Sequence, residues 1–171
     1  MYTFSYMKKV LQAADSGIAY IETGLIILIL GVMVLLSFLQ VIMRNFFDTG
    51  ILWGDIFLRH LVLWVGFIGA SLATREEKHI NIDLLTRLIP QRTVPFAKIL
   101  IDVTSVIVCL VLAKAGWEFV SMEIEANTTV FLNVPSWYFE IIIPVGFALI
   151  ALRFIFKIIE QIISMISKKE S

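Results

Sequence analysis

The chain alternates between long apolar stretches and short polar breaks, and four of the stretches are long enough to cross a membrane. The first covers about residues 18–47 and contains an uncharged run of 21 residues, from Thr23 to Met43. About 20 apolar residues are enough to cross a bilayer as a helix, so this stretch predicts a transmembrane helix. The other three predicted spans are apolar cores flanked by long charged side chains that can reach the interface, at about 54–74, 94–116 and 135–166.

A different pattern follows the second span. On a helical wheel, Ile80, Leu84 and Leu88 lie on one side with other apolar residues, while Asp83 and Arg87 lie on the opposite side. A helix of this kind lies flat at a membrane interface, and Pro90 would end it. The sequence therefore predicts an all-α integral membrane protein. We expect this protein to form a single domain over 1–171, with four transmembrane helices and one interfacial amphipathic helix over about 79–90.

Composition supports a membrane location. Hydrophobic residues make up 59% of the chain, charged residues 16%, and the mean hydropathy is +0.91. Soluble domains carry about 25% charged residues. A chain of this length cannot hide the excess in a core of its own, so lipid or a partner protein must cover it. Lys8 and Lys9 precede the first span as in a secretory signal, but that span is too long for a signal core and we expect it to be retained.

The basic residues predict the orientation. Three of the 14, Arg44, Arg59 and Lys114, lie on one side of the predicted membrane, and the other eleven lie on the opposite side. Because basic residues favour the cytoplasmic side, both termini and the loop between the second and third spans are predicted to be cytoplasmic. The formal net charge is zero, which gives no attraction to nucleic acid.

Candidate chemistry within the spans is sparse. Glu22, with Lys8 and Lys9 nearby, and Glu140 lie near span ends, which favours interfacial anchoring over ion transport. Asp102 could pair with Lys98 one turn before it, and an interfacial or interhelical pairing is favoured for it as well. The lone cysteine, Cys109, lies in an apolar run and is expected to act as a small buried hydrophobe.

We find no motif in the sequence that supports enzyme activity. His60 and His79 would lie about 28 Å apart along a helix, so they cannot share one iron. The sequence shows no nucleophile with its base, no phosphate-binding loop and no metal-ligand spacing. We therefore predict no enzyme activity, no cofactor and no metal.

Gly66 and Gly69 favour close helix packing over a substrate path. Pro144 predicts a kink in the fourth span.

Four segments taken together resemble one transporter family. They are Trp53–Arg59 (WGDIFLR), Leu63–Ala70 (LWVGFIGA), Arg75–Asp83 with its closing HINID, and Val134–Trp137 (VPSW) followed by Pro144-Val-Gly. In combination they resemble the small membrane subunit, of the DctQ type, of tripartite ATP-independent periplasmic (TRAP) transporters. One departure is that Ile56 follows Asp55, where the family tends to carry a second acidic residue.

The resemblance implies a non-catalytic small permease subunit in the bacterial inner membrane. In this family a periplasmic substrate-binding protein delivers an organic acid, of the sialic acid or dicarboxylate class, to a large M-type subunit. That large subunit is sodium-coupled and moves like an elevator. The small subunit is implied to be a scaffold, surrounded by membrane lipids, that packs against the large subunit and helps to dock the binding protein.

The implied scaffold assigns three sets of residues. The set for packing against the large subunit is Trp64, Gly66, Gly69, Ala70, Pro144 and Gly146. The set for anchoring the interfacial helix is Arg75, His79, Asp83 and Arg87. The set for docking the binding protein is Asp48, Asp55, Glu118, Glu123 and Glu125.

Two alternatives stay open from the residues themselves. The main one is an autonomous, dimeric four-helix exporter of the small multidrug type, in which Glu22 would bind a cation or proton. The length of this chain and its elaborate loops disfavour that class. The other is a membrane anchor for a soluble enzyme, which would need a partner that the sequence does not name.

Overall fold

The computed structural model describes residues 2–76 and 93–169, and its regular structure is helical. The helices are α1 (Tyr2–Phe46), α2 (Gly54–Glu76), α4 (Val94–Ala126), α5 (Trp137–Glu140) and α6 (Ile142–Lys169). Within the described ranges the only strand-like pairing is an isolated bridge between Thr129 and Pro135. The predicted interfacial helix over 79–90, with His79, Asp83 and Arg87, lies outside the described residues.

In the described part of the chain, four helical segments have the length and apolar character needed to cross a membrane: Gln12–Phe46, Gly54–Arg75, Phe96–Ala126 and Trp137–Met165. The prediction of an all-α protein with four spans is therefore confirmed.

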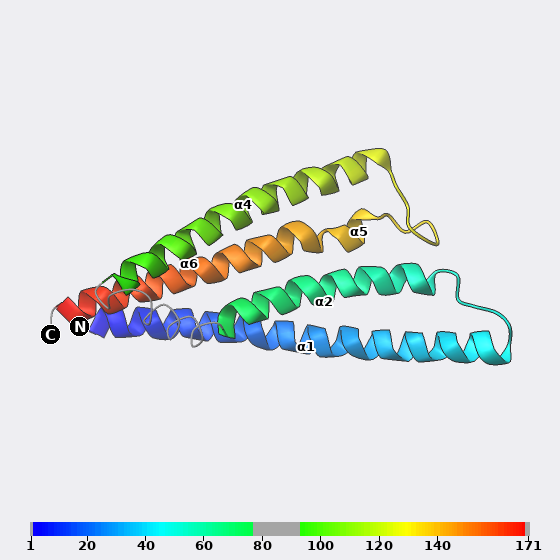
Figure 1. The fold of residues 1–171 in the computed structure, drawn as a ribbon, viewed down its shortest axis with the longest axis horizontal. Coiled ribbons are helices and arrows are strands. Elements are labelled where there is room, and N and C mark those ends of the chain that lie inside the picture. The colour runs from blue at the N-terminus through cyan, green and yellow to red at the C-terminus, as the bar shows by residue number, and fades with distance from the viewer. Residues whose placement is uncertain (1, 77–92, 170–171) are drawn as a thin grey trace.

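The helices lie side by side in a layer instead of surrounding one core (Figure 1). The order across the layer is α1, α2, α6, α4, so α6 contacts helices on both of its sides. Both chain termini lie at one end of the layer, called here the terminal end. The connections 47–53 and 127–136 lie at the opposite end, called here the loop end. Two hairpins, α1–α2 and α4–α6, are thus joined through the contact of α2 with α6.

Two helices are longer than the sequence predicted. Helix α1 has 45 residues, about 68 Å at the helical rise, which is more than twice the hydrocarbon thickness of about 30 Å. Helix α4 has 33 residues and continues ten positions beyond the predicted end at Gly116. Both extensions contain good helix formers, such as Lys8, Lys9 and Gln12 in α1 and Met122, Glu123 and Glu125 in α4, and these support helix beyond the predicted spans. Helix α4 stops at Asn127, which has φ 49° and caps the helix with a bond from its N–H to the Ile124 carbonyl.

Pro144 breaks the fourth span as predicted. A proline has no N–H to donate to the carbonyl four residues earlier, here that of Glu140. The span accordingly divides at Ile141 into the single turn α5 and the long helix α6.

The buried core is small, and many apolar side chains face outward. Ile29, Ile68 and Ile142 form its centre, with Trp64 and Phe67 packed against them. Many other apolar side chains are exposed, such as Leu35 at 68%. That distribution suits a layer whose faces contact lipid or another protein. Cys109 is buried and free, as expected from its apolar surroundings.

Candidate functional site

The most polar buried site lies where α1, α2 and α6 meet. Glu22 of α1 is 4% exposed and Arg153 of α6 is 3% exposed. Arg153 Nη2 donates to Glu22 Oε2, and Ser71 Oγ of α2 donates to Glu22 Oε1 at 2.7 Å. Each oxygen of the Glu22 carboxylate therefore has a donor, and this one side chain connects three helices.

A second carboxylate extends the network. Asp15 Oδ1 lies 3.4 Å from Arg153 Nη1, and Asp15 Oδ2 accepts a hydrogen bond of 2.9 Å from Arg75 Nε. Arg75 Nη2 also donates to Ser16 Oγ at 3.1 Å. We call Asp15, Glu22, Ser71, Arg75 and Arg153 the buried charge network. Its two acids and two bases balance, which matters because an unpaired charge inside a membrane protein is costly.

The network corrects the expectation for Glu22. We expected an interfacial anchor near Lys8 and Lys9, and the structure instead buries Glu22 against Arg153. The two residues are 131 positions apart, and nothing local in the sequence indicates that they meet. Arg75, assigned to the interfacial helix, here joins α2 to α1.

A second interhelical bond joins α4 to α6. Gln161 Nε2 donates to Asp102 Oδ2 at 2.7 Å, and Asp102 is buried. The prediction that Asp102 would pair between helices is confirmed, with a residue of α6 as its partner.

Three residues assigned to large-subunit packing have partners within the chain. Trp64 Nε1 donates to the Phe139 carbonyl at 2.9 Å. Pro144 packs against Gly116, where an added Cβ would lie 3.2 Å from the Pro144 nitrogen. A Cβ on Gly146 would lie 2.5 Å from Phe67 Cδ1. These contacts hold α6 to α2 and to α4.

The other three residues of that set lie on an open part of α2. Gly66 and Ala70 are exposed, and Gly69 is partly exposed. A Cβ added to Gly66 or Gly69 would meet nothing within 4 Å in the described chain. We call Gly66, Gly69 and Ala70 the small-residue face of α2. It is available to a partner helix.

The five acidic docking candidates all belong to the loop-end part of the chain, but they do not form one cluster. Glu123 accepts a hydrogen bond of 2.7 Å from Ser136 Oγ and another from Thr128 Oγ1, which ties the 127–136 loop to α4. Asp55 accepts a bond of 2.9 Å from Gln40 of α1. The remaining three are exposed: Asp48, Glu118 (3.8 Å from Lys114) and Glu125.

An aromatic cluster at the loop end was not predicted. The Trp53 ring stacks on Phe131 with centroids 5.8 Å apart, and Phe57 lies 5.9 Å from Phe131. His60 lies 4.9 Å from Phe139. The spacing of residues 53, 57 and 60, which puts three rings on one side of α2 and of the turn before it, is the signal that could have revealed it. The cluster holds the two loop-end connections together.

No group of three or more His, Cys, Asp or Glu residues that could hold a metal ion is found in the parts of the chain that the structure covers.

Comparison with known proteins identifies the family. The model of the DctQ component of tripartite ATP-independent periplasmic transporters matches residues 33–163. The C4-dicarboxylate TRAP transporter small permease protein DctQ of Vibrio cholerae is 37% identical over 91 residues, which are 52% of this chain and 36% of that protein. The protein of the same name in Pseudomonas aeruginosa is 25% identical over 171 residues, 80% of each chain.

A longer protein also matches. The sialic acid TRAP transporter permease protein SiaT of Haemophilus influenzae is 32% identical over 73 residues, 43% of this chain and 12% of that protein. The alignment thus spans about a third of the Vibrio relative and an eighth of SiaT. No solved structure matches the chain. The family match runs from the middle of α1 nearly to the end of α6, and the protein therefore belongs to the DctQ component family of TRAP transporters, a family of transporter subunits and not of enzymes.

Proposed function

We propose that this TRAP small permease subunit is a fixed scaffold for a large M-type subunit in the bacterial inner membrane, with both termini in the cytoplasm. The match to one eighth of the longer permease protein SiaT supports such a pairing, since there a small unit of this kind is part of a larger permease chain. The two termini lie at the same end of the layer, as four spans require (Figure 1). The excess of basic residues on the side that the sequence assigns to both termini supports the cytoplasmic assignment.

The observation that carries the proposal is the burial and pairing of the Glu22 carboxylate. Both Glu22 oxygens accept hydrogen bonds, from Ser71 and Arg153. A carboxylate that carries a coupling ion or proton must be open to it, so this arrangement suits a static joint between helices. It also disfavours the autonomous exporter, which would need Glu22 as its binding residue.

The names of the relatives support a proposal for the substrate class. We propose a periplasmic binding protein that delivers an organic acid, of the dicarboxylate or sialic acid class, for sodium-coupled uptake. Docking of that protein would use the exposed acidic side chains at the loop end, Asp48, Glu118 and Glu125, while Asp55 and Glu123 hold the loop-end structure. We also propose that the interfacial helix over 79–90 is fixed by Arg75, His79, Asp83 and Arg87. Residues 1–171 are proposed to form a single domain.

Reconstitution tests the scaffold. Liposomes would carry the large subunit alone, this chain alone, or both, with the binding protein and a labelled organic acid outside and an inward sodium gradient. We expect uptake only when both membrane subunits are present. Uptake by this chain alone, abolished by Glu22→Gln, would contradict the proposal and support the exporter.

Gly66→Leu is expected to weaken assembly with the large subunit without unfolding the chain. Gly66 is exposed and a Cβ added there meets nothing within 4 Å inside the described chain, so we expect the effect to arise at a partner surface. Small residues let membrane helices approach closely, and a leucine at such a contact pushes them apart. The measurement is the ratio of the two subunits after purification through a tag on this chain.

The matched control is Gly31→Leu in α1. Gly31 is also exposed, and a Cβ there also meets nothing within 4 Å. We expect Gly31→Leu to leave the subunit ratio unchanged. Equal losses at Gly31 and Gly66, or no loss at Gly66, would exclude the small-residue face of α2 as the contact.

A further inference from the structure

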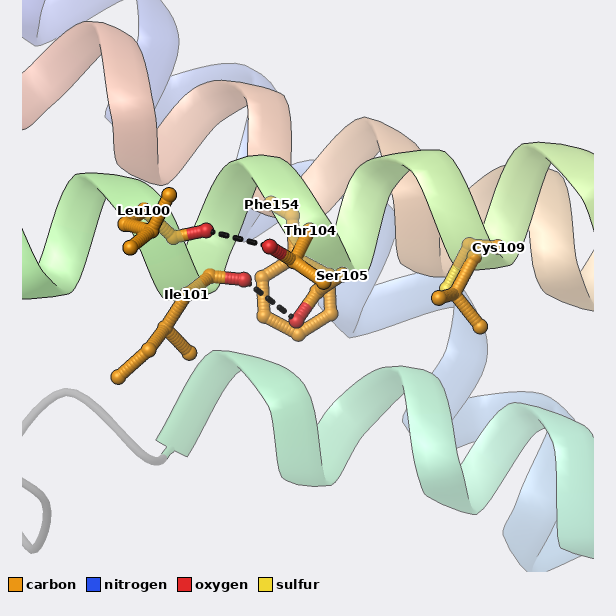
Figure 2. A pocket seen from close by; sticks show the side chains of 7 residues that line it. Leu100, Ile101, Thr104, Ser105, Cys109 and Phe154 are labelled. Carbon is orange, nitrogen blue, oxygen red and sulfur yellow. Dashed lines mark hydrogen bonds between the residues drawn. The ribbon is translucent and has the colours of Figure 1, made fainter.

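A groove between α4 and α6 is separate from every contact described above. It has a volume of about 490 Å³ and lies on α4 from Leu100 to Cys109, with Phe154 of α6 as its floor. Figure 2 shows the Phe154 ring behind Thr104 and Ser105, while Ile101 extends away from α4 beside it. We call this feature the α4–α6 groove.

The groove presents hydrocarbon to its occupant. Leu100, Ile101, Val108 and Phe154 are apolar, and the only hydroxyl groups belong to Thr104 and Ser105. Thr104 Oγ1 donates to the Leu100 carbonyl at 2.8 Å and Ser105 Oγ to the Ile101 carbonyl at 2.9 Å (Figure 2). Because both hydroxyl protons are used within α4, the free thiol of Cys109, a weak donor, is the remaining side-chain donor of the lining. An acyl chain fits this chemistry.

Two lysines lie beyond the groove on its terminal-end side. The Lys157 ammonium lies 5.1 Å from the centroid of the Phe154 ring, which forms the groove floor. Lys98 precedes Ile101 and Ser105 by three and seven positions, so it shares their face of α4. Asp102, on the same helix, is 8% exposed and accepts a hydrogen bond from Gln161 Nε2.

We propose that the α4–α6 groove binds an anionic phospholipid of the cytoplasmic leaflet. One acyl chain would lie along the groove, and the phosphate would lie between Lys98 and Lys157. The charge is complementary, because lysines at the cytoplasmic side of a membrane protein attract anionic head groups with about 1 kcal/mol each. The long lysine side chains can reach the head-group level while their carbons cover apolar surface. Such a lipid would seal α4 to α6 on a face that these two helices leave open.

Photo-crosslinking tests the site. The full chain, purified together with its large subunit, would be reconstituted with phosphatidylglycerol or phosphatidylethanolamine carrying a diazirine in one acyl chain. Peptide mass spectrometry would locate the crosslinks. We expect crosslinks within residues 100–109, with several-fold more phosphatidylglycerol than phosphatidylethanolamine. Lys98→Gln with Lys157→Gln should lower the phosphatidylglycerol signal about fivefold for each lysine.

Three further variants separate the effect of the lysine charges from the effect of the groove shape. Lys114→Gln removes an exposed lysine from the other part of α4 and should leave the crosslinks unchanged. Ser105→Phe fills the groove and should lower the crosslinks of both lipids, whereas Leu110→Phe, at a 52% exposed position outside the groove lining, should not. Crosslinks that miss residues 100–109 would overturn the proposal. So would equal labelling by the two lipids, or crosslinks that appear only when the large subunit is removed, since a protein helix would then occupy the groove.

Discussion

Arg153→Met is expected to lower the free energy of unfolding by about 3–5 kcal/mol, because it removes one side of a buried ion pair. Arg153 is 3% exposed and interacts with both Glu22 and Asp15. Without its guanidinium, Glu22 remains buried with a negative charge and only the Ser71 hydroxyl as donor. The loss is measured by heating the purified chain in detergent to increasing temperatures. The fraction that remains folded at each temperature is monitored by size-exclusion chromatography.

The double variant Glu22→Gln with Arg153→Met is the informative control. It removes one acid and one base, so Asp15 and Arg75 still balance each other at 2.9 Å. Replacing both members of a buried pair is often nearly neutral, so we expect the double variant to recover most of the stability that Arg153→Met loses. A second control is Arg75→Met. The Arg75 side chain is 36% exposed, and its loss should have a clearly smaller effect. A double variant as unstable as Arg153→Met would contradict this account.

The proposed scaffold role also predicts how a Glu22 variant affects transport. Glu22→Gln keeps an oxygen and an amide in the network, so uptake by the assembled transporter should fall only as far as the amount of folded complex falls. Loss of uptake in a fully assembled complex would instead give Glu22 a direct part in transport.

The spans could be predicted from the sequence because lipid imposes a local requirement. Every backbone polar group in a bilayer must be bonded within its own helix, so a long uncharged run such as Thr23 to Met43 has only one outcome. The break at Pro144 is local in the same sense, since it depends on one missing N–H. The ends of α1 and α4 were less predictable, because helical residues continue beyond the membrane with no change in backbone geometry.

The buried charge network could not be predicted for the opposite reason. Arg153 has the same sequence context as a charge at the cytoplasmic end of a span, and it was counted as one. Only the direct contact of α1 with α6 brings it to Glu22, and that contact depends on residues more than a hundred positions apart. The sequence locates such charges along the membrane normal, and the packing of the helices decides which of them are buried.

The glycines show the same limit. Gly66 and Gly146 are both small residues within predicted spans, and both were assigned to a partner surface. The structure leaves Gly66 open and closes Gly146 against Phe67 of α2. Residue type indicates a close approach of helices, but not whether the approaching helix belongs to the same chain.

Gly146→Ala is expected to destabilise the chain by about 1–3 kcal/mol through overpacking. The new methyl group would lie 2.5 Å from Phe67 Cδ1 and 2.8 Å from Phe67 Cβ. A rotation of the ring moves Cδ1 away but leaves Cβ in place, so α2 and α6 must separate. That contact joins the α1–α2 hairpin to the α4–α6 hairpin, and its loss should also lower recovery of the complex with the large subunit.

A series of glycine-to-alanine variants tests this prediction through the order of their unfolding temperatures. At Gly116 the added Cβ would lie 3.0 Å from Ile143 Cγ2 and 3.2 Å from the Pro144 nitrogen, and at Gly66 it would meet nothing within 4 Å. Unfolding temperatures in detergent should therefore fall most for Gly146→Ala and less for Gly116→Ala, while Gly66→Ala stays near the original value. Since alanine is the better helix former at all three positions, helix propensity alone would predict that none of them falls. A fall at Gly146 that is no larger than at Gly66 would mean that Phe67 moves aside freely, and that the α2–α6 contact does not hold the two hairpins together.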